Sequence, residues 1–348
     1  MATWRSTLVA AALVWVVGLG LAGGPACGRD VKLVVRPQKM PAEVGKYALL
    51  PPVASLTEGD AMPFYEKALQ ALPGKASGDQ IRQWLELPIE QLPIDPVGEA
   101  LEQYVGSFRC VVQAIKCRDC RWPAPTPGAP GLGLQPYVDL GWALRLWARY
   151  EIAQENYENA ILALRTGFGM SRHLMQGPTL FHYLRGNAVA GTLVSTDVAD
   201  LMQTGEGPNL YPALAALPKP FTDVERIIVA DEKATPSEPP AGMTRAQFES
   251  ALARSKARRD QVRIFAKHLD ANLAVVQCVE ALRSYAAAHG GQLPQTLADI
   301  TEVAVPKDPM SDAAFRYMRT GATAVLESAA PAGSNAKDVT RYEITVKR

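Results

Sequence analysis

The spacing of apolar residues predicts helices over much of the chain. From residue 60 to about residue 203, apolar side chains recur at intervals of three and four, which places them on one face of a helix. Clear examples are the stripe through Tyr104, Phe108 and Val112 and the run at residues 138–167. We therefore expect a series of helices that each bury one apolar stripe.

Residues 138–167 predict two antiparallel helices. Ala148 lies on the first helix, a polar turn falls at Glu155, and the second helix begins near Tyr157 and includes Gly167. These residues resemble a tetratricopeptide repeat, in which small side chains let two helices pack closely. Glu155 stands where the repeat usually has glycine, and one copy of the repeat is present. An ordinary helical hairpin is therefore the alternative.

A further helix is predicted over residues 179–198, after a break at Gly177 and Pro178. It is rich in small residues, namely Gly186, Ala188, Ala190 and Gly191. Because small side chains let helix axes approach, we expect this helix to pack tightly against its neighbours.

The pattern changes towards the C-terminus. A helix beginning near residue 244 carries an apolar stripe from Phe265 to Ala286. Alternating apolar and polar residues then predict three strands, at residues 315–319, 322–328 and 341–346. The fold class expected is α+β: a mainly α-helical N-terminal domain of helical hairpins, and a small C-terminal domain with one long helix on a three-stranded antiparallel sheet.

Breaks in composition divide the chain into segments. Residues 231–243 are polar and rich in proline, as in linkers between domains. Prolines also interrupt the stretch after residues 31–35, which themselves have the composition of a strand. We predict, in order, a signal peptide (1–26), an extended arm (27–56), a helical domain (57–230), a linker (231–243) and an α+β domain (244–348).

The N-terminal residues indicate export. Arg5 precedes an apolar stretch at residues 8–21, and small residues follow up to Ala26, which is the order found in a secretory signal peptide. Cleavage after Ala26 would place Cys27 first, and a lipid on Cys27 is an alternative. We expect a protein of the periplasm or cell envelope. It would contact a membrane only if Cys27 carries lipid or the signal stays uncleaved.

Composition and charge narrow the function. The chain has 348 residues, of which 48% are hydrophobic and 20% charged, as in globular proteins. Its 36 basic and 35 acidic residues give a formal net charge of +1, which does not favour nucleic acid as a partner. A basic stretch from Arg254 to Lys267 is expected to be a solvated helix face, with an anionic partner or membrane as the alternative.

The cysteines favour a disulfide. Cys110, Cys117 and Cys120 lie close together in the sequence, and the last two form a CxxC motif. In an exported chain we expect a local disulfide among these three. Free thiols and a metal or redox site are the alternatives, but the four histidines lie far away in the sequence. No metal and no cofactor are predicted.

Residues 122–136 contain five prolines and three glycines, so they form neither a helix nor a central strand. Such a loop either covers apolar surface or takes part in binding. Aromatic residues flank it, and a polar cluster lies beside the turn at Gly177 and Pro178. The candidate binding residues are Trp122, Tyr137, Trp142, Arg172, His173 and His182.

The C-terminal part has a characteristic order of elements: a long helix, the turn at residues 289–294, the short helix at residues 295–300, a P-x-D-P loop at residues 306–309 and the three strands. This order resembles the globular domain of type II secretion major pseudopilins. It implies a helix packed on an antiparallel meander. Residues 329–336 replace the acidic calcium-binding loop of that family, so the resemblance does not imply bound calcium.

The whole chain also resembles uncharacterised exported proteins of planctomycete bacteria. The similar motifs are short, and they lie at residues 142–145, 165–168, 172–174, 177–180 and 208–211. This resemblance implies export and no particular activity.

No catalytic motif is evident: the chain lacks GxSxG, HExxH, a Walker A loop and a GxGxxG after a strand. We therefore predict a non-catalytic exported envelope protein that acts as an interaction or scaffold module for a protein partner, with a link to secretion or surface assembly. The alternative is an exported hydrolase with a site under residues 122–136. A hydrolase would bring His173 or His182 together with a carboxylate, whereas a scaffold would present a groove lined by Trp and Tyr.

Overall fold

The structure is a computed structural model that describes residues 30–43, 45–124, 133–330 and 341–347. The predicted signal peptide, Cys27 and residues 125–132 of the predicted loop lie outside the described residues. The helices are α1 (Met62–Gln70), α2 (Lys75–Leu85), α3 (Ile94–Glu102), α4 (Val105–Ala114), α5 (Gln135–Ala153), α6 (Tyr157–Met175), α7 (Leu180–Thr192), α8 (Ala199–Gln203), α9 (Tyr211–Ala215), α10 (Val224–Ala234) and α11 (Arg245–Ala288). The strands are β1 (Asp30–Val35), β2 (Thr57–Asp60), β3 (Cys117–Asp119), β4 (Arg316–Thr320), β5 (Thr323–Glu327) and β6 (Arg341–Val346).

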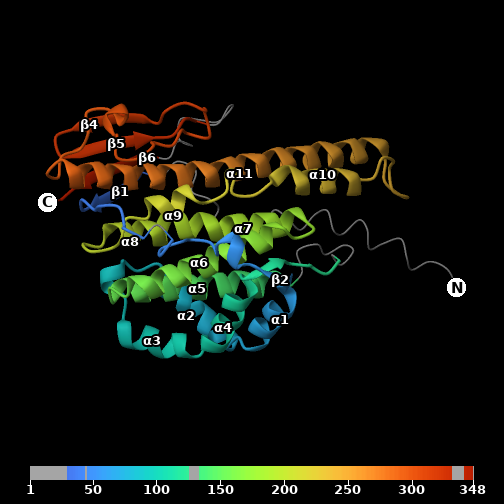
Figure 1. Cartoon of the computed structure of the whole chain (residues 1–348). Coiled ribbons are helices and arrows are strands. Elements are labelled where there is room, and N and C mark those ends of the chain that lie inside the picture. Colours follow the sequence, from blue (N-terminus) through green and yellow to red (C-terminus); the bar gives the residue numbers. More distant parts are fainter. Residues whose placement is uncertain (1–29, 44, 125–132, 331–340, 348) are drawn as a thin grey trace.

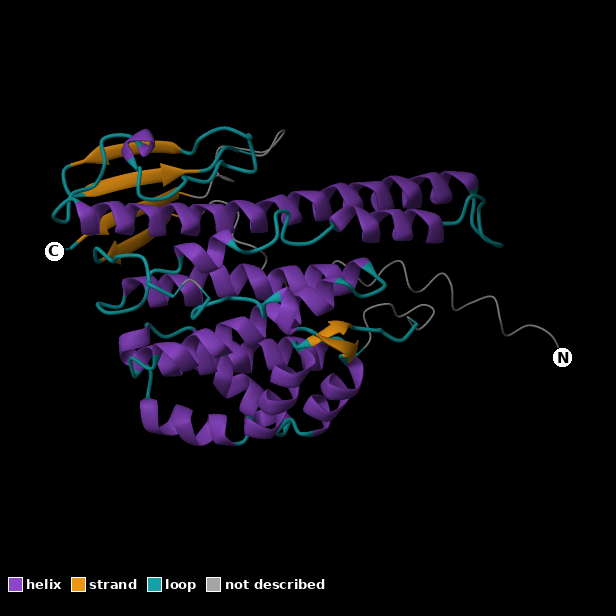
Figure 2. Cartoon of the chain, viewed as in Figure 1, coloured by secondary structure: helices purple, strands orange, loops and turns teal. Residues whose placement is uncertain are grey.

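The helices are arranged in layers (Figure 1). Helices α5, α6 and α7 form the middle of the molecule, the short helices α1 to α4 lie on one side of them, and α11 lies on the other side. The sheet that contains β4, β5 and β6 packs against one end of α11 (Figure 2). The described chain is therefore α+β and mostly helical, as predicted.

Helices α5 and α6 confirm the predicted hairpin. The turn between them contains Glu155 in a left-handed conformation, with φ of 60°. Small residues allow close contact with the next layer: a Cβ atom at Gly167 would lie 2.8 Å from Leu193 Cδ1, and one at Gly186 would lie 2.5 Å from the backbone oxygen of Ser171. The small residues of α6 and α7 therefore permit the tight packing expected from the sequence.

The helix predicted at residues 179–198 changes form before its end. Helix α7 stops at Thr192, and a π-helical turn, Leu193–Val198, leads into α8. Two acidic residues of this region face arginines of α5: Arg145 Nε lies 2.7 Å from Asp197 Oδ2, and Arg149 Nε lies 3.0 Å from Asp200 Oδ2. These ion pairs are largely buried, and they connect α5 to the segment after α7.

The C-terminal sheet corrects the prediction of three antiparallel strands. It is a four-stranded mixed sheet in the order β1, β6, β5, β4. The added strand, β1, comes from the predicted extended arm and pairs in parallel with β6, with Leu33 opposite Ile344. Leu33 and Val35 alternate onto the buried face, which explains why this segment joins a sheet. Spacing along the sequence does not identify a strand's partner.

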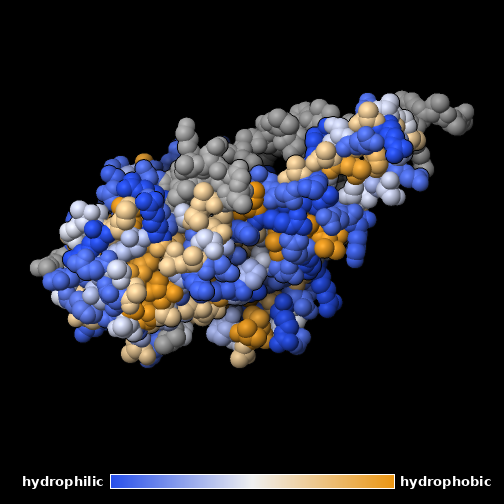
Figure 3. Space-filling model, turned by 90° about the horizontal axis from the view of Figure 1, so that it is seen from above, coloured by the Kyte–Doolittle hydropathy of each residue, from blue (hydrophilic) through white to orange (hydrophobic). Residues whose placement is uncertain are grey.

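The predicted linker is partly helical. Residues 231–234 belong to the end of α10, which buries Ile227 and Ile228. Helix α10 packs along α11, where Arg259 Nη1 lies 3.2 Å from Asp231 Oδ2. The basic stretch of α11 is thus partly neutralised by acidic residues of α10. Figure 3 views this side of the molecule, which is largely hydrophilic and has separate apolar patches.

A buried polar network attaches the arm to α11. Arg283 and Glu280 are fully buried and form an ion pair of 2.9 Å. Arg283 Nε also donates to the backbone oxygen of Arg36 at 3.0 Å, and Asn209 Nδ2 donates to the backbone oxygen of Glu280 at 3.1 Å. Helix α11 contacts α7 and α9 as well as β6. The sequence predicted that its apolar stripe packs on the strands, whereas these two helices cover part of it.

Candidate functional site

Four of the six predicted binding residues come together between the helical layers. The ring of Trp122 lies 5.1 Å from that of Tyr137 and 4.8 Å from that of His182, measured between centroids. Trp122 Nε1 donates to the backbone oxygen of His173 at 2.8 Å. Tyr65, which the sequence analysis did not single out as a binding residue, completes this aromatic cluster, 5.8 Å from His173.

The two histidines of the aromatic cluster have hydroxyl partners. His173 Nδ1 is 2.8 Å from Tyr65 Oη, and His182 Nδ1 is 2.8 Å from Thr179 Oγ1. Burial lowers the pKa of each histidine to about 4, so both rings are neutral at pH 7. Tyr137, His173 and His182 are all buried. The cluster is packed like a core, and the nearby Asp60 carboxylate raises the pKa of His173 by less than burial lowers it.

Trp142 and Arg172 do not belong to the packed contacts of this cluster. Trp142 lies beneath the guanidinium of Arg82, whose Cζ is 4.7 Å from the ring centroid. Arg172 is half-buried, and its Nε is buried with no hydrogen-bond partner among the described residues. Burial lowers the pKa of Arg172. Arg172 nevertheless lies close enough to His173 to lower the pKa of that histidine, whereas Trp142 contacts Arg82.

Cys110, Cys117 and Cys120 are free thiols in the structure, so the predicted disulfide is not formed there. Cys117 starts β3, and its thiol donates to the backbone oxygen of Gln113 at 3.7 Å. Burial raises the pKa of the Cys117 and Cys120 thiols, which suppresses the reactive thiolate. A disulfide among these three cysteines stays a prediction.

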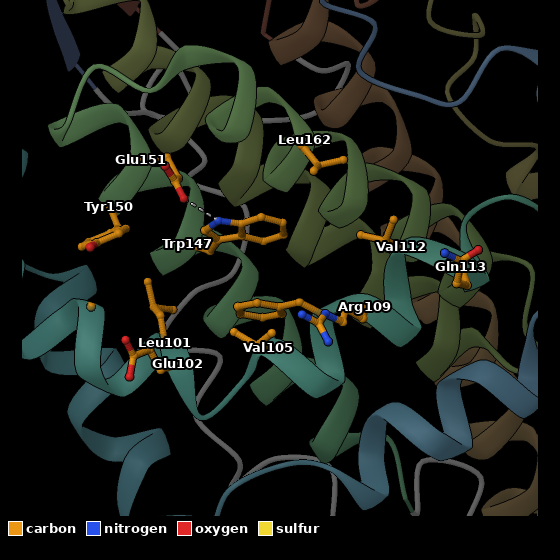
Figure 4. Close-up of a pocket in the computed structure, with 12 residues that line it drawn as sticks. Leu101, Glu102, Val105, Arg109, Val112, Gln113, Trp147, Tyr150, Glu151 and Leu162 are labelled. Atoms are coloured by element: carbon orange, nitrogen blue, oxygen red, sulfur yellow. Dashed lines mark hydrogen bonds between the residues drawn. The ribbon is translucent and has the colours of Figure 1, made fainter.

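The structure contains a groove elsewhere, between the layer of short helices and the central helices (Figure 4). It has a volume of about 430 Å³ and lies between α3 and α4 on one wall and α5 and α6 on the other. This size is typical of ligand sites. The groove is lined by Gly98, Leu101, Glu102, Val105, Phe108, Arg109, Val112, Gln113, Trp147, Tyr150, Glu151 and Leu162.

Aromatic stacking fixes the wall of the groove. The Trp147 ring stacks on Phe108, with centroids 4.9 Å apart and planes inclined by 13°. Trp147 Nε1 donates to Glu151 Oε1 at 3.0 Å, one turn further along α5. Gly98 lets α3 approach Tyr150, because a Cβ atom there would lie 2.9 Å from Tyr150 Oη. These contacts hold an apolar surface in place with a carboxylate at its edge.

The sequence did not predict this groove, although two features of the sequence are related to it. Phe108 and Val112 belong to the apolar stripe that was expected to be buried, yet the neighbouring Val105 is 40% exposed. Trp147 and Glu151 are one helical turn apart, a spacing that brings side chains together. What the sequence did not show is that the stripe of α4 is only partly covered by α5 and α6.

Comparisons with known proteins identify no relative: no family model, no curated protein and no solved structure matches the chain. The resemblances described above therefore stay hypotheses. Among the described residues, no helix has both the length and the apolar composition needed to cross a membrane. Within the same residues, no group of three or more His, Cys, Asp or Glu side chains could hold a metal ion.

Proposed function

We propose that this protein is a non-catalytic, exported interaction protein of the cell envelope, and that the groove between α3, α4, α5 and α6 binds an apolar segment of a protein partner. The groove itself carries the proposal. Its apolar lining includes Leu101, Val105, Phe108, Trp147 and Leu162. Rigid aromatic side chains in a concave apolar site are typical of surfaces that bind a partner.

The placement of the histidines supports binding over catalysis. A hydrolase needs a polar group that reaches its substrate, together with a partner that moves protons. His173 and His182 instead pack edge-on against Tyr65 and Trp122, respectively, and both are buried. The groove offers Trp147 and Tyr150, the residue types expected of a scaffold.

The C-terminal part supports a role in secretion or surface assembly. Its order of long helix, turn, Asp308 loop and antiparallel strands is the order on which the pseudopilin resemblance rests. Asp308 is buried and accepts hydrogen bonds from Ser328 Oγ at 2.8 Å and Met310 N at 2.9 Å, so it holds the loop against the sheet. In this proposal the C-terminal part acts as a structural module and the groove selects the partner.

Site-specific photo-cross-linking in the native host tests the proposal. A photoreactive amino acid replaces Val105, which lines the groove, and in a second strain it replaces Val229 on α10. Val229 is a matched control because the two valines are 40% and 43% exposed. We expect a discrete adduct from the envelope fraction at position 105 and not at position 229. The proposal is wrong if position 105 gives no adduct or if both positions give the same adducts.

A further inference from the structure

We infer that the segment bound in the groove is cationic as well as apolar, and that Glu151 receives its Lys or Arg side chain while the exposed Glu102 adds negative charge at the same end. This inference rests on the proposed function, because it specifies the partner of the same groove. Glu102 and Glu151 come from different walls and lie towards one end of the groove, whereas Arg109 and Gln113 lie towards the other (Figure 4).

Glu151 is a buried carboxylate that forms no ion pair among the described residues. It is 9% exposed, and its donors are neutral: Trp147 Nε1 at 3.0 Å and Asn159 Nδ2 at 3.4 Å. Within the described residues, neither Glu151 nor Glu102 forms an ion pair. Because a buried carboxylate loses its hydration, a cation placed beside it in the groove gains a strong partner.

Other buried carboxylates in this protein are compensated more fully. Asp197 pairs with Arg145 at 2.7 Å, and Glu280 pairs with Arg283 at 2.9 Å. Asp308 lacks a cation but accepts from several donors, including the backbone nitrogen of Ala329 at 2.6 Å. Glu151 has fewer and longer hydrogen bonds than Asp308, and it lines a cavity. It is therefore the carboxylate best placed to bind an external cation.

The helix ends around the groove add negative potential. Glu102 is the last residue of α3, and Glu151 lies in the last turn of α5. Neither helix has a basic residue in its last turn. The carbonyl groups at a helix C-terminus favour a cation, so the helix ends and the carboxylates act in the same direction. An anionic lipid would be repelled at this end.

The chemistry of the groove thus fits one class of partner, a basic amphipathic protein segment. Its apolar side chains would lie over Phe108 and Trp147, and its Lys or Arg would reach Glu151. An amphipathic helix that docks with apolar anchors one turn apart is a common way to fill such a groove. Arg109 at the other end would disfavour a second cation there.

Binding of small probes to the full mature chain tests the inference. Octylammonium combines an alkyl chain with the charge of a lysine, and octanol has the same chain without the charge. Titration calorimetry at low salt should show octylammonium binding about five- to tenfold more tightly than octanol. Glu151→Gln and Glu102→Gln should each reduce this preference. Glu99→Gln is the matched control, since Glu99 is exposed on α3 and does not line the groove.

The outcomes separate this inference from the proposed function. Equal binding of octylammonium and octanol, or a preference that survives in Glu151→Gln and Glu102→Gln, would overturn the cationic partner and leave the apolar groove intact. Failure of both probes to bind would also overturn it. Absence of a specific cross-linked adduct at position 105 would instead overturn the proposed function, regardless of how octylammonium and octanol bind.

Discussion

At the scale of single residues, Glu155 shows where the sequence and the backbone disagree. It occupies the turn between α5 and α6 with φ of 60°. A left-handed conformation costs a residue with a Cβ atom about 1 kcal/mol relative to glycine. The tetratricopeptide resemblance expects glycine at this position, and the backbone there has the conformation that glycine favours.

We therefore expect Glu155→Gly to raise the free energy of unfolding by about 1 kcal/mol. Urea denaturation of the mature protein measures the change. Glu155→Ala is the control, because it removes the carboxylate and keeps the Cβ atom. Equal effects of the two substitutions would show that backbone strain is not the cause.

His182 is one of two buried histidines, with His173, at which pH should act on stability. Burial lowers its pKa from the ordinary value of 6.5 to about 4. Between these values the unfolded chain binds a proton that the folded chain does not, so stability is lost as the pH falls from 6.5 towards 4. His182→Asn removes this contribution. The stability difference between the wild type and the variant should change by up to about 1.4 kcal/mol per pH unit in that range.

Urea denaturation at pH 7, 6 and 5 checks this expectation for His182. The wild type should lose more stability than His182→Asn over these steps. Parallel pH profiles of the two proteins would contradict the lowered pKa. The wild type must be compared with His182→Asn, because other groups also titrate in this range. Burial raises the pKa of Asp200 to about 6, for example, which shifts stability in the opposite direction over part of the range and does so equally in both proteins.

At the scale of elements, β1 is the main addition to the predicted fold. Leu33 and Val35 are buried, whereas Val34 between them is 37% exposed. We expect Leu33→Ala to cost about 2–5 kcal/mol, as other substitutions that leave a cavity do. Val34→Ala should cost less than about 0.5 kcal/mol. If denaturation gives similar values for both, β1 is not an integral strand of the sheet.

Elements with a strong local signal were predicted well. Helices α5, α6 and α7 and strands β4, β5 and β6 follow from apolar periodicity, because a helix or a hairpin strand is stabilised by near neighbours in the sequence. The end of α10 was assigned to a linker because its residues are polar. This end is held to α11 by the pair between Arg259 Nη1 and Asp231 Oδ2 at 3.2 Å, next to the buried Ile227 and Ile228, and these contacts join positions far apart in the sequence.

At the scale of the whole molecule, the packing argues against independent folding of residues 244–348, which the sequence predicts to be a separate domain. Helix α11 buries its apolar stripe partly on α7 and α9, and the sheet takes β1 from the N-terminal arm. We therefore expect residues 244–348, when expressed alone, to melt without a cooperative transition, because they lack these partners.

A protease site inserted at residues 235–243 provides the complementary test. After cleavage, the two pieces should stay associated on size-exclusion chromatography, since the buried Arg283 and Glu280 connect α11 to the arm and to Asn209. Separation of the pieces, with cooperative melting of the C-terminal one, would show that residues 244–348 are an independent domain, as the composition alone suggested.

The sequence by itself determined the helical hairpins, the C-terminal strands and the α+β class, because these depend on periodic burial over short distances. It also named six candidate binding residues, of which Trp122, Tyr137, His173 and His182 lie together in the structure. Only the tertiary structure decided that this group is packed, that β1 pairs with β6, and that the open groove lies at Trp147 and Glu151. The physical reason is that exposure and long-range pairing depend on which surfaces other elements leave uncovered, and local spacing does not encode that.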